Sequence, residues 1–389
     1  MTLAVDTLFF RRQVLSALGA SEAESQELLR YNENTFQRTA PPGFPLPDEP
    51  FVVDWQRYAA QSEESGTIIP LLRNLIEFRF PIQEGMSQTA EYIAATRRGV
   101  DPGDMPGACA LSLVAPDKVR LLLHSTPAGR IPLLVIAIRE DFVTLVRALS
   151  KRNEPVPISD SMGACIIGGY NNWSRMHACL RQFENADSPA DAGDRQKVFQ
   201  RVASDKSLYQ DRFILLSSGP YSSVNAERLG LETDEWIRVS MIIRREHECA
   251  HYFTRRIFGS MRNAVLDELI ADFAGITAAL GTFRADWFLL FVGLEDFPRY
   301  RSGARLENYR GTPPLSDGAF AILQGMVRDA AFNLERFTLR HRDVVENPGL
   351  RSSLLTILSC FTIEELASVK GDELLASQFS NVQQRGAIA

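Results

Sequence analysis

The residues whose types and spacing could do chemistry lie between residues 245 and 253, which contain the pattern His-Glu-x-x-His. His247 and His251 are four residues apart, so on an α-helix both imidazoles project from one face and can share a metal ion. Glu248 follows the first histidine directly and can lean over the open side of that metal. The flanking residues are apolar at helical spacing and contain no proline. We therefore predict a metal-carrying helix from about Asp234 that ends at Gly259.

A second stretch, separated from His251 by sixteen residues, supplies carboxylates at helical spacing. Glu268 and Asp272 are four residues apart and share a face of the helix predicted there. With Glu268 as third ligand the set is two histidines and one carboxylate, with one position open for water. This ligand set is typical of catalytic zinc sites and not of closed structural ones. Asp272, one turn further on, can accept a hydrogen bond from an imidazole N–H that faces away from the metal.

The two patterns together resemble the gluzincin clan of zinc metallopeptidases. The short gap between them is similar to that of thermolysin-like members, and Glu-x-x-Ala-Asp is similar to the HtpX-like and prenyl-protein endopeptidases. The resemblance covers residues 237 to 280. It implies zinc on His247, His251 and Glu268, with Glu248 as general base and Asp272 holding a ligand histidine.

The same five residues have a plainer interpretation, a pair of ordinary helices with core histidines and surface charges. Five polar groups on two otherwise apolar helix faces would be costly to bury without a shared partner. This cost favours the metal site.

Composition bounds the class of protein. The chain has 389 residues, 45% hydrophobic and 23% charged, which is ordinary for a globular protein of one large or two smaller domains. Its net charge of −6 gives no basic field to recruit nucleic acid or an anionic membrane, so we expect neither as a partner. The arginine pair 244–245 is predicted to be a solvated helix face or, beside a metal, a site for a substrate carboxylate.

Cysteine usage and hydropathy indicate the compartment. Five widely spaced cysteines without a C-x-x-C pattern argue against a disulfide framework and for a reducing environment. Cys249, two residues beyond His247, is predicted to be a packing residue. No stretch of about 18 apolar residues occurs, and Arg11 and Arg12 follow the apolar start instead of preceding it. We therefore predict a cytoplasmic protein without a membrane span, unlike the membrane-embedded peptidases that share Glu-x-x-Ala-Asp.

The predicted fold class is α+β and mostly helical: a gluzincin-like catalytic domain with a small β-sheet before the motif helix, and an N-terminal mixed α/β region. Residues 1–185 form that region, helical to about residue 100 with strands between about 108 and 138. Residues 186–389 form the zinc metallopeptidase-like domain. The polar, small-residue segment 185–194 marks the boundary.

Strand predictions rest on short apolar runs. Residues 110–114 and 119–124 are predicted as a hairpin, followed by a buried strand at 131–138. A strand at 213–218 would correspond to the edge at which gluzincins receive an extended peptide. Residues 156–175 are predicted to be a conformationally demanding loop, either facing a site or packed as a tight turn. The tail after Gln378 is predicted to be frayed.

The function predicted from the resemblance is a zinc-dependent hydrolase, a metallopeptidase or amidase, acting on a peptide or an amide-containing substrate. The alternative is a non-hydrolytic zinc-holding binding or regulatory protein that uses residues 299–310 as its contact surface. The intact Glu248 argues against that alternative, because a structural site does not need it. Tyr300, Tyr309 and His341 are all eligible to stabilise an oxyanion, and the sequence does not choose among them. It also leaves open the substrate, the endo- or exopeptidase mode and the oligomeric state.

Overall fold

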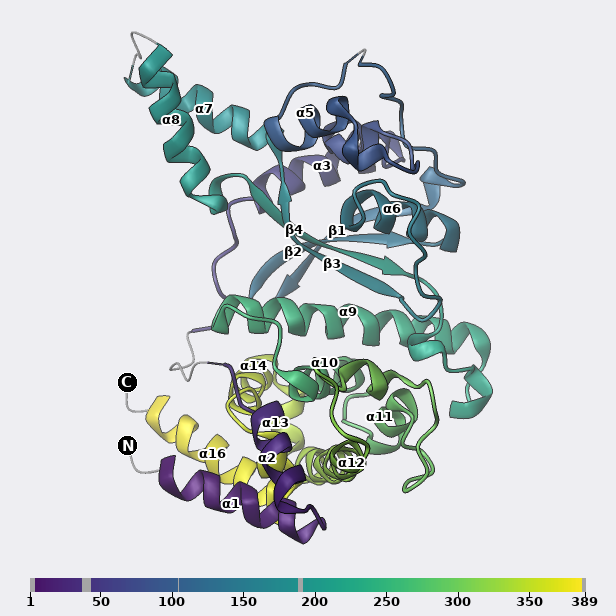
Figure 1. Ribbon diagram of the computed structural model, residues 1–389, viewed down its shortest axis with the longest axis vertical. Coiled ribbons are helices and arrows are strands. Elements are labelled where there is room, and N and C mark those ends of the chain that lie inside the picture. The colour runs from purple at the N-terminus through teal and green to yellow at the C-terminus, as the bar shows by residue number, and fades with distance from the viewer. Residues whose placement is uncertain (1–3, 37–42, 104, 188–191, 387–389) are drawn as a thin grey trace. The chain divides into compact units, whose positions relative to one another are not determined.

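The structure is a computed structural model that describes residues 4–36, 43–103, 105–187 and 192–386 (Figure 1). The chain forms two compact units. The first unit joins residues 1–46 to residues 220–389, and the second comprises residues 47–219. Within the described residues the fold is mostly helical with a four-stranded mixed sheet, which confirms the α+β class.

The division into units differs from the predicted boundary at residues 185–194. Residues 188–191 lie outside the described residues, and the helices on either side, α7 (Trp173–Asp187) and α8 (Ala192–Ser204), pack against each other within the second unit. The N-terminal helices α1 (Ala4–Ala17) and α2 (Glu22–Tyr31) belong instead with the C-terminal half, where they contact helices that follow residue 316. Such contacts between distant parts of the chain leave no mark in local composition.

The sheet of the second unit has the strand order β1-β2-β4-β3. β1 and β2 form an antiparallel hairpin, β2 pairs in parallel with β4, and β4 pairs antiparallel with β3. The helices α3 (Val52–Ser65) and α6 (Arg139–Ser150) pack against it, and the apolar residues of β2 and β4 are largely buried. The strand bounds are β1 Val119–Thr126, β2 Gly129–Ile136, β3 Ala164–Asn171 and β4 Gln210–Ser217.

Two strand predictions and one loop prediction need correction. Residues 110–114 form no strand, because this extended segment pairs only with the chain at residues 78–79, where Leu111 N–H donates to the carbonyl of Phe78. The predicted loop 156–175 contains β3, which has a bulge between Ile167 and Tyr170. β4 was expected at an edge, but it lies between β2 and β3, so both of its sides already carry main-chain partners.

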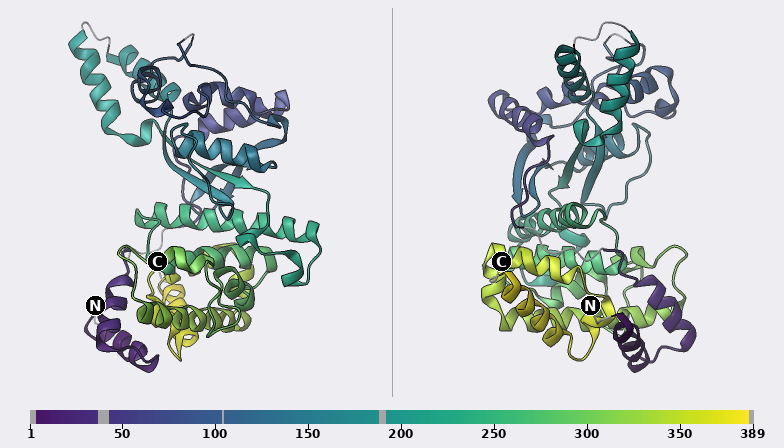
Figure 2. Two further views of the ribbon diagram at one scale, coloured as in Figure 1. Left: turned by 45° about the vertical axis from the view of Figure 1, so that its right-hand side comes forward. Right: turned by 90° about the vertical axis from the view of Figure 1, so that its left-hand side faces the viewer.

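Two long helices of the first unit carry the predicted motifs. α9 (Thr233–Phe258) begins and ends as predicted, and Gly259 ends it with a left-handed backbone at φ 74°. α10 (Ala264–Leu280) follows after a short turn and runs alongside α9 (Figure 2). At Gly275 a Cβ would lie 2.6 Å from the carbonyl oxygen of Ile243, so only glycine permits this closeness.

α10 is enclosed within the first unit. Its predicted apolar positions Leu266, Leu269, Ile270, Phe273 and Ile276 are all buried. None of the described helices combines the length and apolar composition needed to cross a bilayer. The tail predicted to fray is helical, because α16 continues to residue 386 and packs on α12 and α14. The other helices of this unit are α11 (Ala285–Val292), α12 (Asp317–Arg340), α13 (Arg342–Glu346), α14 (Pro348–Leu358), α15 (Ile363–Ala367) and α16 (Gly371–Gly386).

Candidate metal centre

α9 and α10 bring three potential metal ligands together. His247 and His251 lie one turn apart on α9, with their Nε2 atoms 3.1 Å from each other. Glu268 lies in the first half of α10, and its two carboxylate oxygens are each 3.6 Å from one of these nitrogens. Among the described residues, these three form the group of side chains that could hold a metal ion.

The spacing of the ligand atoms fits zinc. Two atoms bound to zinc at about 2.0–2.1 Å in tetrahedral geometry lie about 3.3 Å from each other. The two Nε2 atoms are 3.1 Å apart, and each lies 3.6 Å from a different oxygen of Glu268. With one ligand atom per residue, the three atoms lie within 4.8 Å of one another. Two imidazoles and one carboxylate also match the ligand preference of that ion, and three protein ligands leave one tetrahedral position open.

The outer nitrogen of His247 is held by a polar cluster. Its Nδ1 lies 3.0 Å from Oδ1 of Asp272, where the sequence predicts this carboxylate, and Asp272 is fully buried. Tyr221 was not predicted: its hydroxyl lies 2.9 Å from the same Nδ1 and donates to Asp272 Oδ1 at 2.5 Å. Arg305 donates to Asp272 Oδ2, to the Tyr221 hydroxyl at 2.9 Å and to Ser222 Oγ at 3.0 Å. These contacts fix the orientation of His247.

His251 has a carboxylate of its own. Its Nδ1 lies 2.7 Å from Oδ2 of Asp267, the residue directly before the third ligand. Thr254 donates to the other oxygen of Asp267 at 3.3 Å. The sequence predicts one carboxylate, Asp272, for either histidine, whereas in the structure each histidine has a carboxylate of its own. Asp267 begins the second motif stretch, but its role depends on where the first turn of α10 meets α9.

Tyr309 is the oxyanion candidate that reaches this centre. Its hydroxyl donates to Oε2 of Glu268 at 2.8 Å, and its carbonyl accepts a hydrogen bond from the hydroxyl of Tyr31 in α2. Tyr300 donates instead to the carbonyl of Ala304, which stabilises its own loop. His341 caps the end of α12, with its ring 4.7 Å from that of the neighbouring Phe337.

Burial and charge give the two histidines opposite pKa shifts. Burial and the neighbouring charge of His251 hold the pKa of His247 well below its usual range. Burial also lowers the pKa of His251, but its hydrogen bond and ion pair with Asp267 outweigh burial and raise it to about 10. Burial would raise the pKa of Glu268, yet the two histidines and Arg305 lower it.

Glu248 lies beside the ligands. Burial raises the pKa of its carboxyl group, the charge of His251 lowers this pKa, and the charge of Glu268 raises it further. The predicted solvated face at residues 244–245 is wrong for Arg244, which is 4% exposed, donates to the carbonyl of Pro220 and lies over the ring of Tyr221. Arg244 is buried because Pro220 and Tyr221 follow the second unit's last strand and cover this part of α9. Cys249 is buried, as predicted for a packing residue.

Two of the residues missed by the sequence analysis come from irregular segments. Tyr221 lies in the 3-10 turn Tyr221–Ser223, which has no motif of its own. Arg305 begins the 3-10 segment Arg305–Tyr309, so one short segment supplies both Arg305 and Tyr309. The arginine-rich loop 299–310 was noticed, but as a contact surface of the alternative function.

The comparisons with known proteins give a family but no activity. The family described as "Family of unknown function (DUF7005)" matches residues 13–370. Neither the curated proteins nor the solved structures contain a match to the chain.

Proposed function

The chain belongs to this family of unknown function, and we propose that it is a zinc-dependent hydrolase that cleaves a peptide or amide bond. The observation that carries the proposal is the convergence of His247, His251 and Glu268 on one point, with Glu248 next to them. A closed structural zinc site has four protein ligands, whereas this group offers three. The proposal includes a gluzincin-like architecture for the α9–α10 pair, supported by the order and spacing of its motif residues.

The residues of the chain would divide the work as follows. When bound, zinc supplies a Lewis acid that lowers the pKa of a water molecule and polarises a carbonyl group. Glu248 accepts the proton of the attacking water and passes it to the leaving nitrogen. Asp272 and Asp267 hold the Nδ1 atoms of the two imidazoles, so that the two Nε2 atoms point toward each other. The Tyr309 hydroxyl donates its one proton to Glu268, and by turning from this carboxylate it can donate instead to an oxyanion of the substrate.

The proposal places the reaction in the cytoplasm, supported by the five cysteines, all of which are free thiols. A peptide substrate would need a binding surface other than β4, whose two sides are already paired. The endo- or exopeptidase mode is therefore left to the assay.

One pair of measurements tests the proposal and separates it from a zinc-holding binding protein. Purified protein reconstituted with zinc should contain about one zinc per chain and should hydrolyse members of a peptide or acyl-amide library. Glu248→Gln should keep the zinc and lose at least about a hundredfold in turnover, because the proton acceptor is gone while the ligands remain. Glu246→Gln is a matched control on the same helix, where the carboxylate pairs with Arg245 and is no ligand.

The possible outcomes are distinct. A protein that takes up no zinc contradicts the metal centre. Hydrolysis that survives in Glu248→Gln contradicts the assigned base. Zinc uptake without hydrolysis of any substrate in the library would favour the binding or regulatory function instead.

A further inference from the structure

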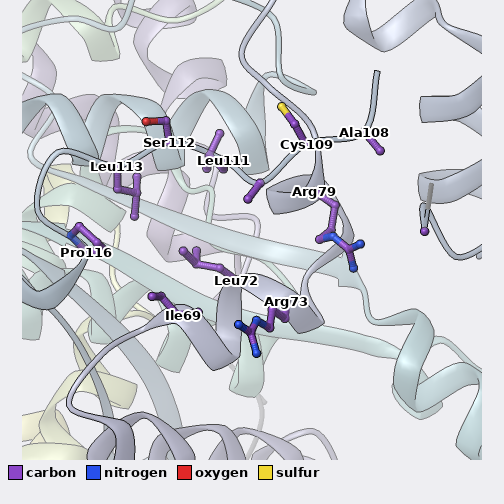
Figure 3. A pocket seen from close by; sticks show the side chains of 12 residues that line it. Ile69, Leu72, Arg73, Arg79, Ala108, Cys109, Leu111, Ser112, Leu113 and Pro116 are labelled. Atoms are coloured by element: carbon purple, nitrogen blue, oxygen red, sulfur yellow. The ribbon is translucent and has the colours of Figure 1, made fainter. Parts of the chain in front are cut away.

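The second unit contains a pocket that has no part in the proposed hydrolysis. It has a volume of about 730 Å³ and lies between α4 (Ile69–Asn74) and the extended segment 108–113 (Figure 3). This volume is within the range of about 300–1,000 Å³ that is usual for small-molecule sites.

The charged groups of the pocket are both cationic. Of the lining residues that the structure describes, Arg73 and Arg79 are the ionised ones, and none is a carboxylate. Among the described residues, neither guanidinium has a hydrogen-bond or ion-pair partner. Figure 3 shows both arginines on the side of the pocket away from Pro116. Two unpaired guanidinium groups beside one pocket favour a ligand with an anionic group, which can accept paired hydrogen bonds from them.

The remainder of the lining is mostly apolar. Leu72 and Ile69 project from α4, and Leu111 and Leu113 face them from the extended segment (Figure 3). Ile69 is 41% exposed, whereas Leu71 on the same helix is fully buried. A hydrocarbon tail laid between these side chains would remove apolar surface from water on both sides. A plain inorganic anion would leave that surface exposed.

Both walls of the pocket are held in place. The segment 109–111 is fixed by main-chain hydrogen bonds to residues 78–79, with Leu111 N–H donating to Phe78 at 2.8 Å. Its far end is fixed by Asp141, whose carboxylate accepts from the N–H groups of Val114 and Ala115 at 2.6 and 2.9 Å. Leu72 and Leu113 also pack against the main core of this unit. A ligand therefore meets a preformed surface and pays little for ordering it.

We propose that this pocket binds a small amphipathic carboxylate, with its carboxylate on Arg73 and Arg79 and its aliphatic tail between Leu72 and Leu113. The proposal is independent of the metal centre, because every lining residue belongs to the second unit. It assigns the second unit a ligand-binding role.

Calorimetric titration of the full-length protein with octanoate, 1-octanol and acetate tests each half of the ligand. Octanoate should bind at one saturable site, and the alcohol and the short acid should each bind at least about tenfold more weakly. The double variant Arg73→Gln/Arg79→Gln should lose about tenfold or more in octanoate affinity, the scale expected for losing charged hydrogen bonds. Arg120→Gln, an exposed arginine on β1 outside the pocket, should bind like wild type.

Cys109 gives a second, local readout. It is exposed and lines the pocket, so bound octanoate should slow its alkylation, measured by peptide mass mapping with half-buried Cys360 as internal reference. Wild-type affinity in the double variant would overturn the proposal, as would equal binding of octanoate and octanol. Protection of Cys109 by acetate as strong as by octanoate would reduce the pocket to a plain anion site and also overturn it. If the double variant melts differently from wild type, Arg73→Gln alone, at an exposed position, gives the same comparison.

Discussion

Asp272→Asn is the perturbation whose consequences can be worked furthest from the structure. Asp272 is fully buried, lies 3.0 Å from His247 Nδ1, and accepts hydrogen bonds from Tyr221 and Arg305. The asparagine keeps the size of the side chain but removes its charge and replaces one of its two acceptor oxygens by an NH₂ group, so the hydrogen bond that orients His247 is weakened. We expect zinc affinity to fall by about 10–100-fold, the scale known for such partners of metal-ligating histidines. That range corresponds to about 1.4–2.8 kcal/mol.

The same substitution should also destabilise the metal-free protein. Arg305, whose side chain is 17% exposed, would remain in place without its carboxylate partner. Removing one member of a buried ion pair costs about 3–5 kcal/mol, and the residual exposure of Arg305 places the expected loss at or below the lower end. A solvated helix charge would change stability by less than about 0.5 kcal/mol. The two interpretations of Asp272 therefore predict stability losses that differ severalfold and zinc affinities that differ at least about tenfold.

The assay is a competitive zinc titration against a chromogenic chelator, together with urea unfolding of the metal-free protein. Asp286→Asn is the matched control: it makes the same chemical change in the same unit, at a carboxylate that is 60% exposed and pairs with Arg284. Its zinc affinity should equal that of wild type. If Asp272→Asn behaves like this control in both measurements, the assigned positioning of His247 is refuted. The double variant Asp272→Asn/Arg305→Met should be less destabilised than the sum of its single changes, because no unpaired cation remains.

Three further predictions concern separate groups. His251→Ala should remove most of the bound zinc, measured by elemental analysis after reconstitution, because two ligands hold the ion far less firmly than three. Tyr309→Phe should retain zinc but lower kcat by about 10²–10³ if this hydroxyl stabilises the oxyanion; an unchanged kcat would exclude it. In the second unit, burial raises the pKa of Glu77 to about 7, although a hydrogen bond from Tyr170 opposes the shift. Since this group ionises near its ordinary pKa of 4.5 in the unfolded chain, wild-type stability should fall relative to Glu77→Gln as pH rises from 4.5 to about 7, by up to about 3 kcal/mol. Urea unfolding of both proteins at several pH values in this range measures the difference between their free energies of unfolding. A difference that does not change with pH would contradict the raised pKa.

The sequence predicted what helical periodicity controls. His247, His251, Glu268 and Asp272 lie on regular helices, where a spacing of four residues sets a common face. Gly259 ended the first helix because its left-handed backbone favours glycine. Neither pattern predicts the distance between the two helices. Gly275 permits their close approach, because it has no Cβ to meet the carbonyl oxygen of Ile243.

The remainder depended on contacts between distant segments. Tyr221 and Arg305 reach His247 and Asp272 from 3-10 segments, and no period relates such segments to a helix face. The position of β4 in the sheet was likewise undetermined, because a single apolar run can become an edge or a central strand. The two-unit division was missed because α1 and α2 pack with helices that follow residue 316.

The charges around the ligands supply a reason for the metal that does not depend on the motif. Glu248, Asp267, Glu268 and Asp272 place four carboxylates around His247 and His251. Burial raises the pKa of Asp267, the charge of Glu268 adds to that rise, and the hydrogen bond and charge of His251 oppose it. The positive charges in reach are the guanidinium groups of Arg305 and Arg244, both of which lower the pKa of His247. With both imidazoles neutral, as metal ligands must be, the cluster has two more negative than positive charges, and a protonated His251 would reduce this excess to one. Burying such an excess is costly. A divalent cation at the convergence of the three ligands would balance this excess. A core of merely structural histidines would need no such number of carboxylates, so the charge count argues for the metal centre over a plain helix pair.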